Sequence, residues 1–216
     1  MTIYPSEEIL ELQRYKIKAM EKCNEPYNVD VLGKSIVVLP GVFYPASDTE
    51  LLINSAKVKS DDKVLETFAG TGAISIFFAQ FAKEVIAVDI NPQAIKNIQE
   101  NIKLHKLSKK MKAFQADIFP NERKFDVILI NPPYADKEAK NLIEKAFFDK
   151  DHNIIKRFFK EAKNYLNHEG RIYSTWSNFA DFEFIENLVK ENKYSIVQIA
   201  ETTKDMKVYR VYEIKP

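Results

Sequence analysis

The fold is decided by residues 63–90, which read KVLETFAGTGAISIFFAQFAKEVIAVDI. A short apolar segment (63–68) is followed by a glycine-containing turn, an apolar segment of helical length (72–82) and a second apolar segment (84–90). Two strands joined through a helix are typical of a parallel β-α-β unit, because parallel strands need a long crossover connection. We therefore predict a strand, a helix and a second strand parallel to the first.

The chain beyond residue 90 continues this alternation. The expected elements are a helix (91–105), two strands (111–119 and 124–133), a helix (153–166) stopped by Gly170, a strand (171–177), a helix (181–190) and two final strands (195–201 and 209–215). The final two strands leave room only for a turn at 202–206, so one late strand should be antiparallel. The predicted fold class is α/β, with a doubly wound, mainly parallel seven-stranded sheet and one antiparallel late strand.

The beginning of the chain is predicted to add smaller elements to this sheet. Residues 6–22 have the pattern of a helix capped by Ser6, and residues 35–42 that of an edge strand or hairpin arm interrupted by Pro40. A further helix is expected at 47–56, with Ser47 or Asp48 at its N-cap. We divide the chain into an N-terminal helical extension (1–34) and one α/β domain (35–216).

Composition narrows the classes of function. The 216 residues include 32 Lys and Arg and 31 Asp and Glu, a net charge of +1, which disfavours extensive non-specific binding of nucleic acid. The single cysteine cannot form an internal disulfide, and the first residues lack the basic and apolar regions of a signal peptide. No apolar run approaches the roughly 18 residues of a membrane span. We expect a cytoplasmic protein with no membrane partner and see no metal-ligand cluster.

Polar and glycine residues follow the first two strands of the pattern. The first group is Glu66, Phe68, Ala69, Gly70, Thr71 and Gly72, where the glycines allow close backbone approach to a ligand and the helix start offers free N–H groups. Such glycines can equally form only a turn. The second group is Asp89 and Ile90, at the spacing where an acid reaches the two hydroxyls of a ribose. Asp89 can alternatively cap the next helix.

Two further groups follow the next strands. Asp117 is placed to accept a hydrogen bond from an exocyclic amine such as that of adenine, with Ile118 packing on the ring, or else it is a polar loop residue. Asn131, Pro132, Pro133 and Tyr134 form an Asn-Pro-Pro-Tyr motif directly after the apolar segment FDVILI. The asparagine oxygen and a carbonyl fixed by the prolines can accept both hydrogens of an –NH₂ group, and the tyrosine can stack on a flat substrate.

These groups predict transfer of a group to a weakly nucleophilic nitrogen. The lone pair of an amide or aromatic amine is delocalised, and two acceptors that hold its hydrogens would raise the electron density on nitrogen. An in-line displacement at a sulfonium needs positioning more than acid–base help, because its leaving thioether is neutral. The lack of an evident catalytic histidine or cysteine therefore does not exclude this chemistry.

The four groups together resemble the class I S-adenosylmethionine-dependent methyltransferases. The resemblance implies that Glu66 and residues 68–72 hold the methionine part of the cofactor, that Asp89 holds its ribose and that Asp117 with Ile118 holds its adenine. It assigns the substrate amine to the Asn131–Tyr134 motif, in which Asn131, Pro132 and Tyr134 are the catalytic candidates. Ile90 and Asn131 are further candidate contacts of the cofactor. Enzymes with this motif act on adenine N6, guanine N2 or protein glutamine.

A segment ahead of the glycine loop narrows the choice among these classes of methyl acceptor. Residues 39–53, LPGVFYPASDTELLI, are similar to the corresponding segment of the HemK-like glutamine-N5 methyltransferases of peptide release factors. The FAGTGA loop (68–73) is close to that of ribosomal RNA guanine-N2 methyltransferases. The chain lacks the arginine usual in the polar stretch of the HemK-like segment and carries only about one helix ahead of it.

Several functions remain open from the sequence. Our first hypothesis is an S-adenosylmethionine-dependent N-methyltransferase of a protein glutamine, with a release factor as the candidate substrate. The alternatives are methylation of a nucleic-acid base, which residues 105–112 (HKLSKKMK) would support, and methylation of a small-molecule amine. A nicotinamide-dependent oxidoreductase would need a third loop glycine where Phe68 stands, and the intact Asn-Pro-Pro-Tyr motif disfavours a non-catalytic subunit.

Overall fold

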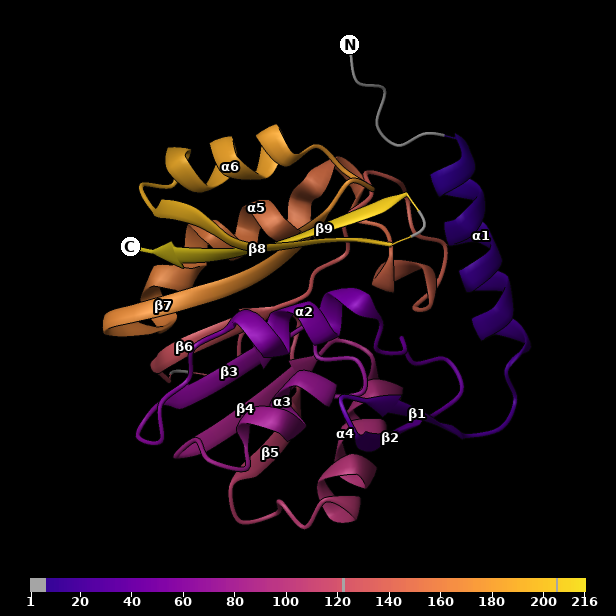
Figure 1. Ribbon diagram of the computed structural model, residues 1–216, viewed down its shortest axis with the longest axis horizontal. Helices are drawn as coiled ribbons and strands as arrows, with labels where there is room; N and C mark the ends of the chain where they lie inside the picture. Colours follow the sequence, from indigo (N-terminus) through magenta and orange to yellow (C-terminus); the bar gives the residue numbers. More distant parts are fainter. Residues whose placement is uncertain (1–6, 122, 205) are drawn as a thin grey trace.

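The computed structural model describes residues 7–121, 123–204 and 206–216, and its core is one seven-stranded sheet between helices (Figure 1). The chain begins with α1 (Glu7–Lys22), the hairpin β1 (Tyr27–Val31) and β2 (Lys34–Val38), and α2 (Ser47–Ser55). The sheet and its helices are β3 (Lys63–Thr67), α3 (Ala73–Phe78), β4 (Glu84–Asp89), α4 (Pro92–Leu104), β5 (Met111–Gln115), β6 (Phe125–Ile130), α5 (Asn153–Glu161), β7 (Leu166–Ser177), α6 (Phe182–Glu191), β8 (Ser195–Lys204) and β9 (Lys207–Lys215). Short 3₁₀ turns lie at Glu144–Ala146, Lys150–His152 and Ala162–Tyr165.

The strand order confirms the predicted fold class. The sheet runs β5-β4-β3-β6-β7-β9-β8, with parallel pairing from β5 through β7. The direction reverses at β9, which is antiparallel to β7 on one side and to β8 on the other. The reason is the short connection between β8 and β9, which permits a hairpin but no crossover helix. The expected turn at 202–206 is shorter than predicted, because β8 continues to Lys204; residue 205 lies outside the described part.

Alternate residues of each central strand enter two separate hydrophobic layers. In β6, Ile128 and Ile130 face the layer that contains α5 and α6, whereas Val127 and Leu129 face the layer that contains α3 and α4. All four side chains are fully buried. Burial of each contributes about 1.5–3 kcal/mol, so a strand with two buried faces needs an almost continuous apolar run. Trp176, expected in the core, is also fully buried.

The N-terminal region contains an element that the sequence did not predict. Residues 27–31 form β1, which pairs antiparallel with β2 through a turn at Leu32 and Gly33 with φ angles of 48° and 80°. The predicted boundary after residue 34 therefore falls inside this hairpin, and the extension is helical only up to Lys22. The proposed cap Ser6 lies outside the described residues.

Two sequence-based boundaries are wrong. The N-cap of α2 is Ala46, and neither Ser47 nor Asp48 caps the helix, because the Asp48 side chain is used in the site described below. The helix expected to stop at Gly170 ends at Glu161, followed by a 3₁₀ turn, and Gly170 lies within β7. The chain enters β7 already at Leu166, which pairs with Phe125 before the register shifts.

Candidate active site

A cavity of about 390 Å³ opens at the carboxyl ends of the central parallel strands. This volume is that of a small-molecule site, and the edge is where ligands bind in open α/β sheets. The predicted residues that line it are Phe68, Gly70, Asp89, Ile90, Asp117, Asn131, Pro132, Pro133 and Tyr134. Segments that follow β3, β4, β5 and β6 thus meet in one place, as the sequence predicted.

The glycine loop after β3 has the backbone conformation that its composition predicts. Gly70 and Gly72 have φ angles of 53° and 74°, and Phe68 is also left-handed at 61°. A Cβ on Gly72 would lie 3.1 Å from the Ile98 side chain, so a larger residue at position 72 would require Ile98 of α4 to shift. Gly72 also occupies the N-cap of α3, so its place in the loop sets where the helix begins.

Glu66 supports the loop from beneath rather than lining the cavity. Its side chain is buried, and Oε2 accepts a hydrogen bond of 2.8 Å from the backbone N–H of Ser75. Burial raises the pKa of Glu66 to about 8, with the nearby charge of Asp89 acting in the same direction and the hydrogen bonding to Ser75 against it. Ala69, Thr71 and Gly72 likewise lie outside the cavity lining. Glu66 therefore fixes the start of α3 against β3.

Asp89 joins the loop after β3 to the turn after β4. Its two carboxylate oxygens accept hydrogen bonds of 2.8 Å, one from the Gly70 N–H and the other from the Asn91 N–H. Burial raises its pKa, although these backbone bonds favour the charged form. The N-cap of α4 is Asn91, which accepts from the Gln93 N–H, so Asp89 does not cap that helix. Each Asp89 oxygen retains a second lone pair for a ligand hydroxyl.

The acid after β5 lies at the exposed side of the cavity. Asp117 accepts a hydrogen bond of 2.5 Å from Arg157 Nη2 of α5, and both side chains are about half exposed. Arg157 itself lines the cavity. Ile118 was expected to pack on the adenine ring, but only 2 % of its surface is exposed and it lies in the sheet core. The structure corrects that expectation, because Ile118 points into the hydrophobic layer; the neighbouring Ile90 lines the cavity instead.

The Asn-Pro-Pro-Tyr motif after β6 is held by a network of polar side chains. Asn131 donates from Nδ2 to Asp48 Oδ2 at 3.2 Å and accepts at Oδ1 from Thr175 Oγ1 at 2.6 Å. The Tyr134 hydroxyl lies within hydrogen-bond distance of Asn131 Oδ1, Asp48 Oδ2 and Thr175 Oγ1. Because Asp48 can only accept when ionised, this network sets the direction of the Asn131 amide, with Nδ2 toward Asp48 and Oδ1 on the other side.

Tyr134 occupies a position different from that of a stacking residue. Its ring is 7 % exposed and packs edge-on against Trp176 at a centroid distance of 5.5 Å. Burial raises its pKa well above the ordinary value, so the hydroxyl remains protonated and can donate. The hydrogen bonds of the Tyr134 hydroxyl help to hold the Asn131 side chain in place. Stacking of the Tyr134 ring on a flat substrate stays a prediction.

A family model identifies the chain. The model of the methyltransferase small domain matches residues 34–210, which is most of the chain and includes every predicted cavity residue. The chain belongs to the methyltransferase small domain family. It is an S-adenosylmethionine-dependent N-methyltransferase, as its family and its relatives agree.

The relatives of this methyltransferase fall into two groups by the substrates in their names. A Methanocaldococcus jannaschii protein assigned to the protein N5-glutamine methyltransferases is 41 % identical over 151 residues, which cover 66 % of this chain and 75 % of that protein. Release factor glutamine methyltransferase of Clostridium acetobutylicum is 34 % identical, over 53 % of this chain and 41 % of the Clostridium protein. Ribosomal RNA small subunit methyltransferase C of Buchnera aphidicola is 29 % identical, over 84 % of this chain and 51 % of the Buchnera protein.

Solved structures confirm the fold of the methyltransferase. The Thermus thermophilus 16S ribosomal RNA N2 G1207 methyltransferase, solved with its methyl donor and guanosine, superimposes with a TM-score of 0.67 at 21 % identity. That match covers 88 % of this chain and 50 % of the other. The Methanocaldococcus jannaschii tRNA m1G37 methyltransferase gives a TM-score of 0.65, also at 21 % identity.

The cavity fits the cofactor that the family uses. The two hydroxyls of the ribose can donate hydrogen bonds to the free lone pairs of the Asp89 carboxylate. The Asp117 carboxylate can accept a hydrogen bond from the adenine amine. The tight approach at Gly70, whose Cβ would lie 3.3 Å from the Phe43 carbonyl oxygen, leaves room there for backbone only. When bound, S-adenosylmethionine supplies the electrophilic methyl group.

Three residues that line the cavity of the methyltransferase, Gly41, Phe43 and Asp48, and the fully buried Thr175 beside it were not predicted as site residues. Asp48 and Thr175 orient Asn131, while Gly41 and Phe43 form a wall near the glycine loop. That wall is anchored from α4, where the fully buried Asn97 accepts from the Leu39 N–H at 2.8 Å and Asn101 similarly binds Val37. The resemblance of residues 39–53 to HemK-like enzymes covered Gly41, Phe43 and Asp48, but not Thr175.

Proposed function

We propose that the protein methylates the side-chain carboxamide nitrogen of a glutamine in a protein substrate, with a peptide release factor as the candidate. One observation carries this proposal: Asp48 contacts both Asn131 and Tyr134. Asp48 belongs to the segment that resembles HemK-like enzymes, so this segment takes part in the acceptor site itself. The relative at 41 % identity, assigned to the protein N5-glutamine methyltransferases, supports the same acceptor.

In this proposal, the chain's residues position and activate the amide. The Tyr134 hydroxyl donates to Asp48 Oδ2, which leaves one lone pair of Asn131 Oδ1 for the substrate beside the bond from Thr175. Asn131 Oδ1 and the backbone carbonyl of Pro132 then accept the two hydrogens of the carboxamide, which raises the electron density on nitrogen and directs it at the methyl carbon. Asp48 and Thr175 hold the Asn131 side chain in the required direction. The transferred methyl forms a bond to nitrogen as the bond to sulfur breaks, and the nitrogen then loses one proton to solvent.

The proposed cofactor site comprises Phe68, Gly70, Asp89, Ile90 and Asp117 in direct contact, with Glu66, Ala69, Thr71 and Gly72 shaping the loop. Asn131 to Tyr134 form the proposed acceptor site. The domain division at residues 34 and 35 remains part of this proposal, with the hairpin bridging the two parts. A cytoplasmic location is proposed because release factors act in translation; no helix among the described residues is long and apolar enough to cross a membrane.

A methyl-transfer assay with labelled cofactor tests this function. Purified release factors, glutamine-containing peptides, ribosomal RNA and cell extract are offered separately, with and without nuclease. We expect label on protein, located by mass spectrometry on a glutamine side chain, with little change between about 50 and 200 mM salt because few phosphates are neutralised. Label that appears only in nucleic acid, or that nuclease removes, would contradict the proposal.

Methylation of a nucleic-acid base is the second candidate. The alignment with the Buchnera ribosomal RNA enzyme covers 84 % of this chain, more than any glutamine enzyme named above, although at only 29 % identity. An enzyme that contacts several phosphates should lose orders of magnitude in affinity over the same salt range. The salt series therefore separates the two functions even before the acceptor atom is known.

A further inference from the structure

Helix α1 contributes polar side chains to the acceptor end of the cavity. Gln13 and Lys16, one turn apart on α1, both line the cavity together with Asp48 and Asn131. The helix is far from these residues in sequence, and it stands at one edge of the molecule beside the segment that precedes α5 (Figure 1). The helix therefore forms a part of the cavity wall that is separate from the glycine loop and from the Asn-Pro-Pro-Tyr motif.

The docking of α1 is specific. Ile17 and Met20 are buried in a small hydrophobic cluster with Ala135, Phe147 and Phe148, which follow the Asn-Pro-Pro-Tyr motif. The remaining faces of the helix carry exposed residues such as Arg14 and Lys18. Because residues 13, 16, 17 and 20 share one face of a helix, the same packing that buries Ile17 and Met20 turns Gln13 and Lys16 toward the cavity.

Gln13 has an unused acceptor in this wall. Its side chain is only 3 % exposed, and its Oε1 has no hydrogen-bond partner. A buried carbonyl oxygen without a partner costs about 1–3 kcal/mol, so such a group needs an explanation. A ligand N–H that arrives in the cavity would remove this cost.

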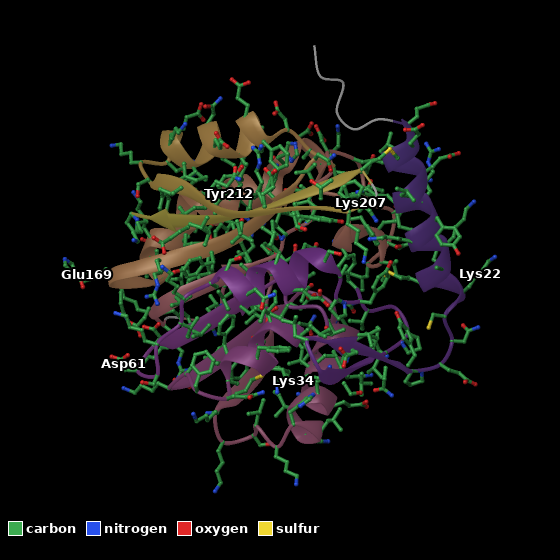
Figure 2. The ribbon with its side chains drawn as sticks, viewed as in Figure 1. Lys22, Lys34, Asp61, Glu169, Lys207 and Tyr212 are labelled. Atoms are coloured by element: carbon green, nitrogen blue, oxygen red, sulfur yellow. The ribbon has the colours of Figure 1, made fainter. Side chains whose placement is uncertain are left out.

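Lys16 places a positive charge beside the same space. Its Nζ lies 5.6 Å from the centre of the Tyr44 ring, and the negative charge of Asp48 favours its charged form. Burial is the main cause of its lowered pKa, with the charge of Lys207 adding to the effect. Figure 2 shows Lys207 at the start of β9, on the side of the molecule that faces α1. An acceptor carbonyl would give this ammonium a partner.

From this arrangement we infer that Gln13 and Lys16 bind the main chain of a peptide acceptor. Gln13 Oε1 accepts a backbone N–H of the peptide and Lys16 Nζ donates to a backbone carbonyl, which leaves the acceptor's own carboxamide for Asn131. This inference rests on the proposed function, because it assumes an acceptor residue within a polypeptide. Both side chains are specificity-determining residues, since they touch the acceptor and take no part in the transfer.

Matched variants test this role in the full chain. Gln13→Leu keeps the size of the side chain but removes its polar atoms, and Lys16→Met keeps the stem but removes the charge. Arg14→Leu and Lys18→Met on exposed positions of the same helix are the controls. The measurements are kcat and KM with an unmodified glutamine-containing peptide that the wild type methylates, cofactor affinity by calorimetry, and the melting temperature.

We expect Gln13→Leu and Lys16→Met each to raise the peptide KM about tenfold, the loss of one hydrogen bond to a buried or charged group. Cofactor affinity should stay within about twofold, and kcat should change less than KM. The melting temperature of Gln13→Leu should not fall, because the variant removes an unpaired buried acceptor; a merely structural role would lower it. The two controls should match the wild type.

Three results would overturn the inference or separate it from the proposed function. An unchanged peptide KM in both α1 variants contradicts the role of α1 while glutamine methylation itself stands. A parallel loss of cofactor affinity would assign Gln13 and Lys16 to the cofactor site instead. If the wild-type protein methylates only RNA and no glutamine peptide, the proposed function fails and the peptide site fails with it.

Discussion

The two ends of the cavity are built in different ways. At the cofactor end, Asp89 binds the backbone N–H groups of Gly70 and Asn91, residues in the turns that follow β3 and β4. At the acceptor end, Asn131 is held by the side chains of Asp48 and Thr175, which are 83 and 44 residues away in sequence. The first end depends on local backbone geometry, and the second depends on side chains that only the complete fold brings together.

This difference predicts that substitutions can impair turnover and cofactor binding separately. A change at the acceptor end should reduce turnover while the cofactor still binds, whereas a change at Asp89 should weaken cofactor binding. Variants whose effects cross from one end to the other would show that the two ends act as a unit.

The largest effect is expected for Asn131→Ala. Removal of the acceptor oxygen should lower kcat about 10²- to 10³-fold, by analogy with the loss of one positioned hydrogen-bonding group in other active sites. Cofactor affinity, measured by calorimetry, should change little because Asp89 and Gly70 are untouched. A variant with near-normal kcat would remove the Asn-Pro-Pro-Tyr motif from the reaction.

Asp89→Ala should have the next largest effect, at the opposite end. The substitution leaves the Gly70 and Asn91 N–H groups without their partner and removes the proposed acceptors of the ribose hydroxyls. Hydrogen bonds to a charged group contribute about 1.5–3 kcal/mol, so we expect the cofactor Kd to rise about 10- to 100-fold. Equal cofactor binding by Asp89→Ala and wild type would contradict the ribose assignment.

Asp48→Asn sharpens the comparison with a smaller change. The variant keeps the shape of the side chain, but its amide can no longer accept at both oxygens from Thr49 N–H, Asn131 Nδ2 and the Tyr134 hydroxyl. We expect kcat to fall about tenfold with unchanged cofactor affinity. Asp61→Asn, at the exposed edge of the molecule far from α1 (Figure 2), is the control. Equal kcat in both variants would show that Asn131 needs no support from Asp48.

We expect Glu66 to make the stability of the folded protein depend on pH. Its pKa rises from an unfolded value of 4.5 to about 8 in the folded protein, so the folded state binds the proton more tightly. The stability contribution of this group is therefore present below about pH 4.5 and is lost as pH rises toward about 8, with a slope of at most about 1.4 kcal/mol per pH unit. Denaturant titrations of wild type and Glu66→Gln should diverge over this range, with the variant less dependent on pH. Parallel stability curves would show that Glu66 keeps an ordinary pKa.

The smallest effect is expected for Arg157→Gln. The ion pair between Arg157 and Asp117 is about half exposed, and exposed pairs contribute about 0–1 kcal/mol. Cofactor affinity should change less than about threefold, and added salt should reduce even that difference. A tenfold loss would mean that Arg157 itself binds the cofactor.

The sequence by itself determined the scaffold and the cofactor end. Strand and helix alternation specified the parallel sheet because each apolar run must be buried on both faces, and β9 had to be antiparallel because its connection to β8 is short. Gly70, Asp89, Asp117 and Asn131 each lie within three residues of the end of a strand, so their convergence at one edge could be inferred without coordinates.

Only the tertiary structure decided which side chains support the acceptor end. Asp48 has the local pattern of a helix cap, yet burial of α2 against the sheet turns its carboxylate toward Asn131 and Tyr134. Ile118 was expected in the cavity, but it lies in the irregular segment after β5 and its side chain is buried in the core. Gln13 and Lys16 show no signal in the sequence, because their position depends on how α1 packs against residues more than one hundred positions away. Local periodicity predicts elements, whereas contacts between distant side chains depend on the orientation of every element between them.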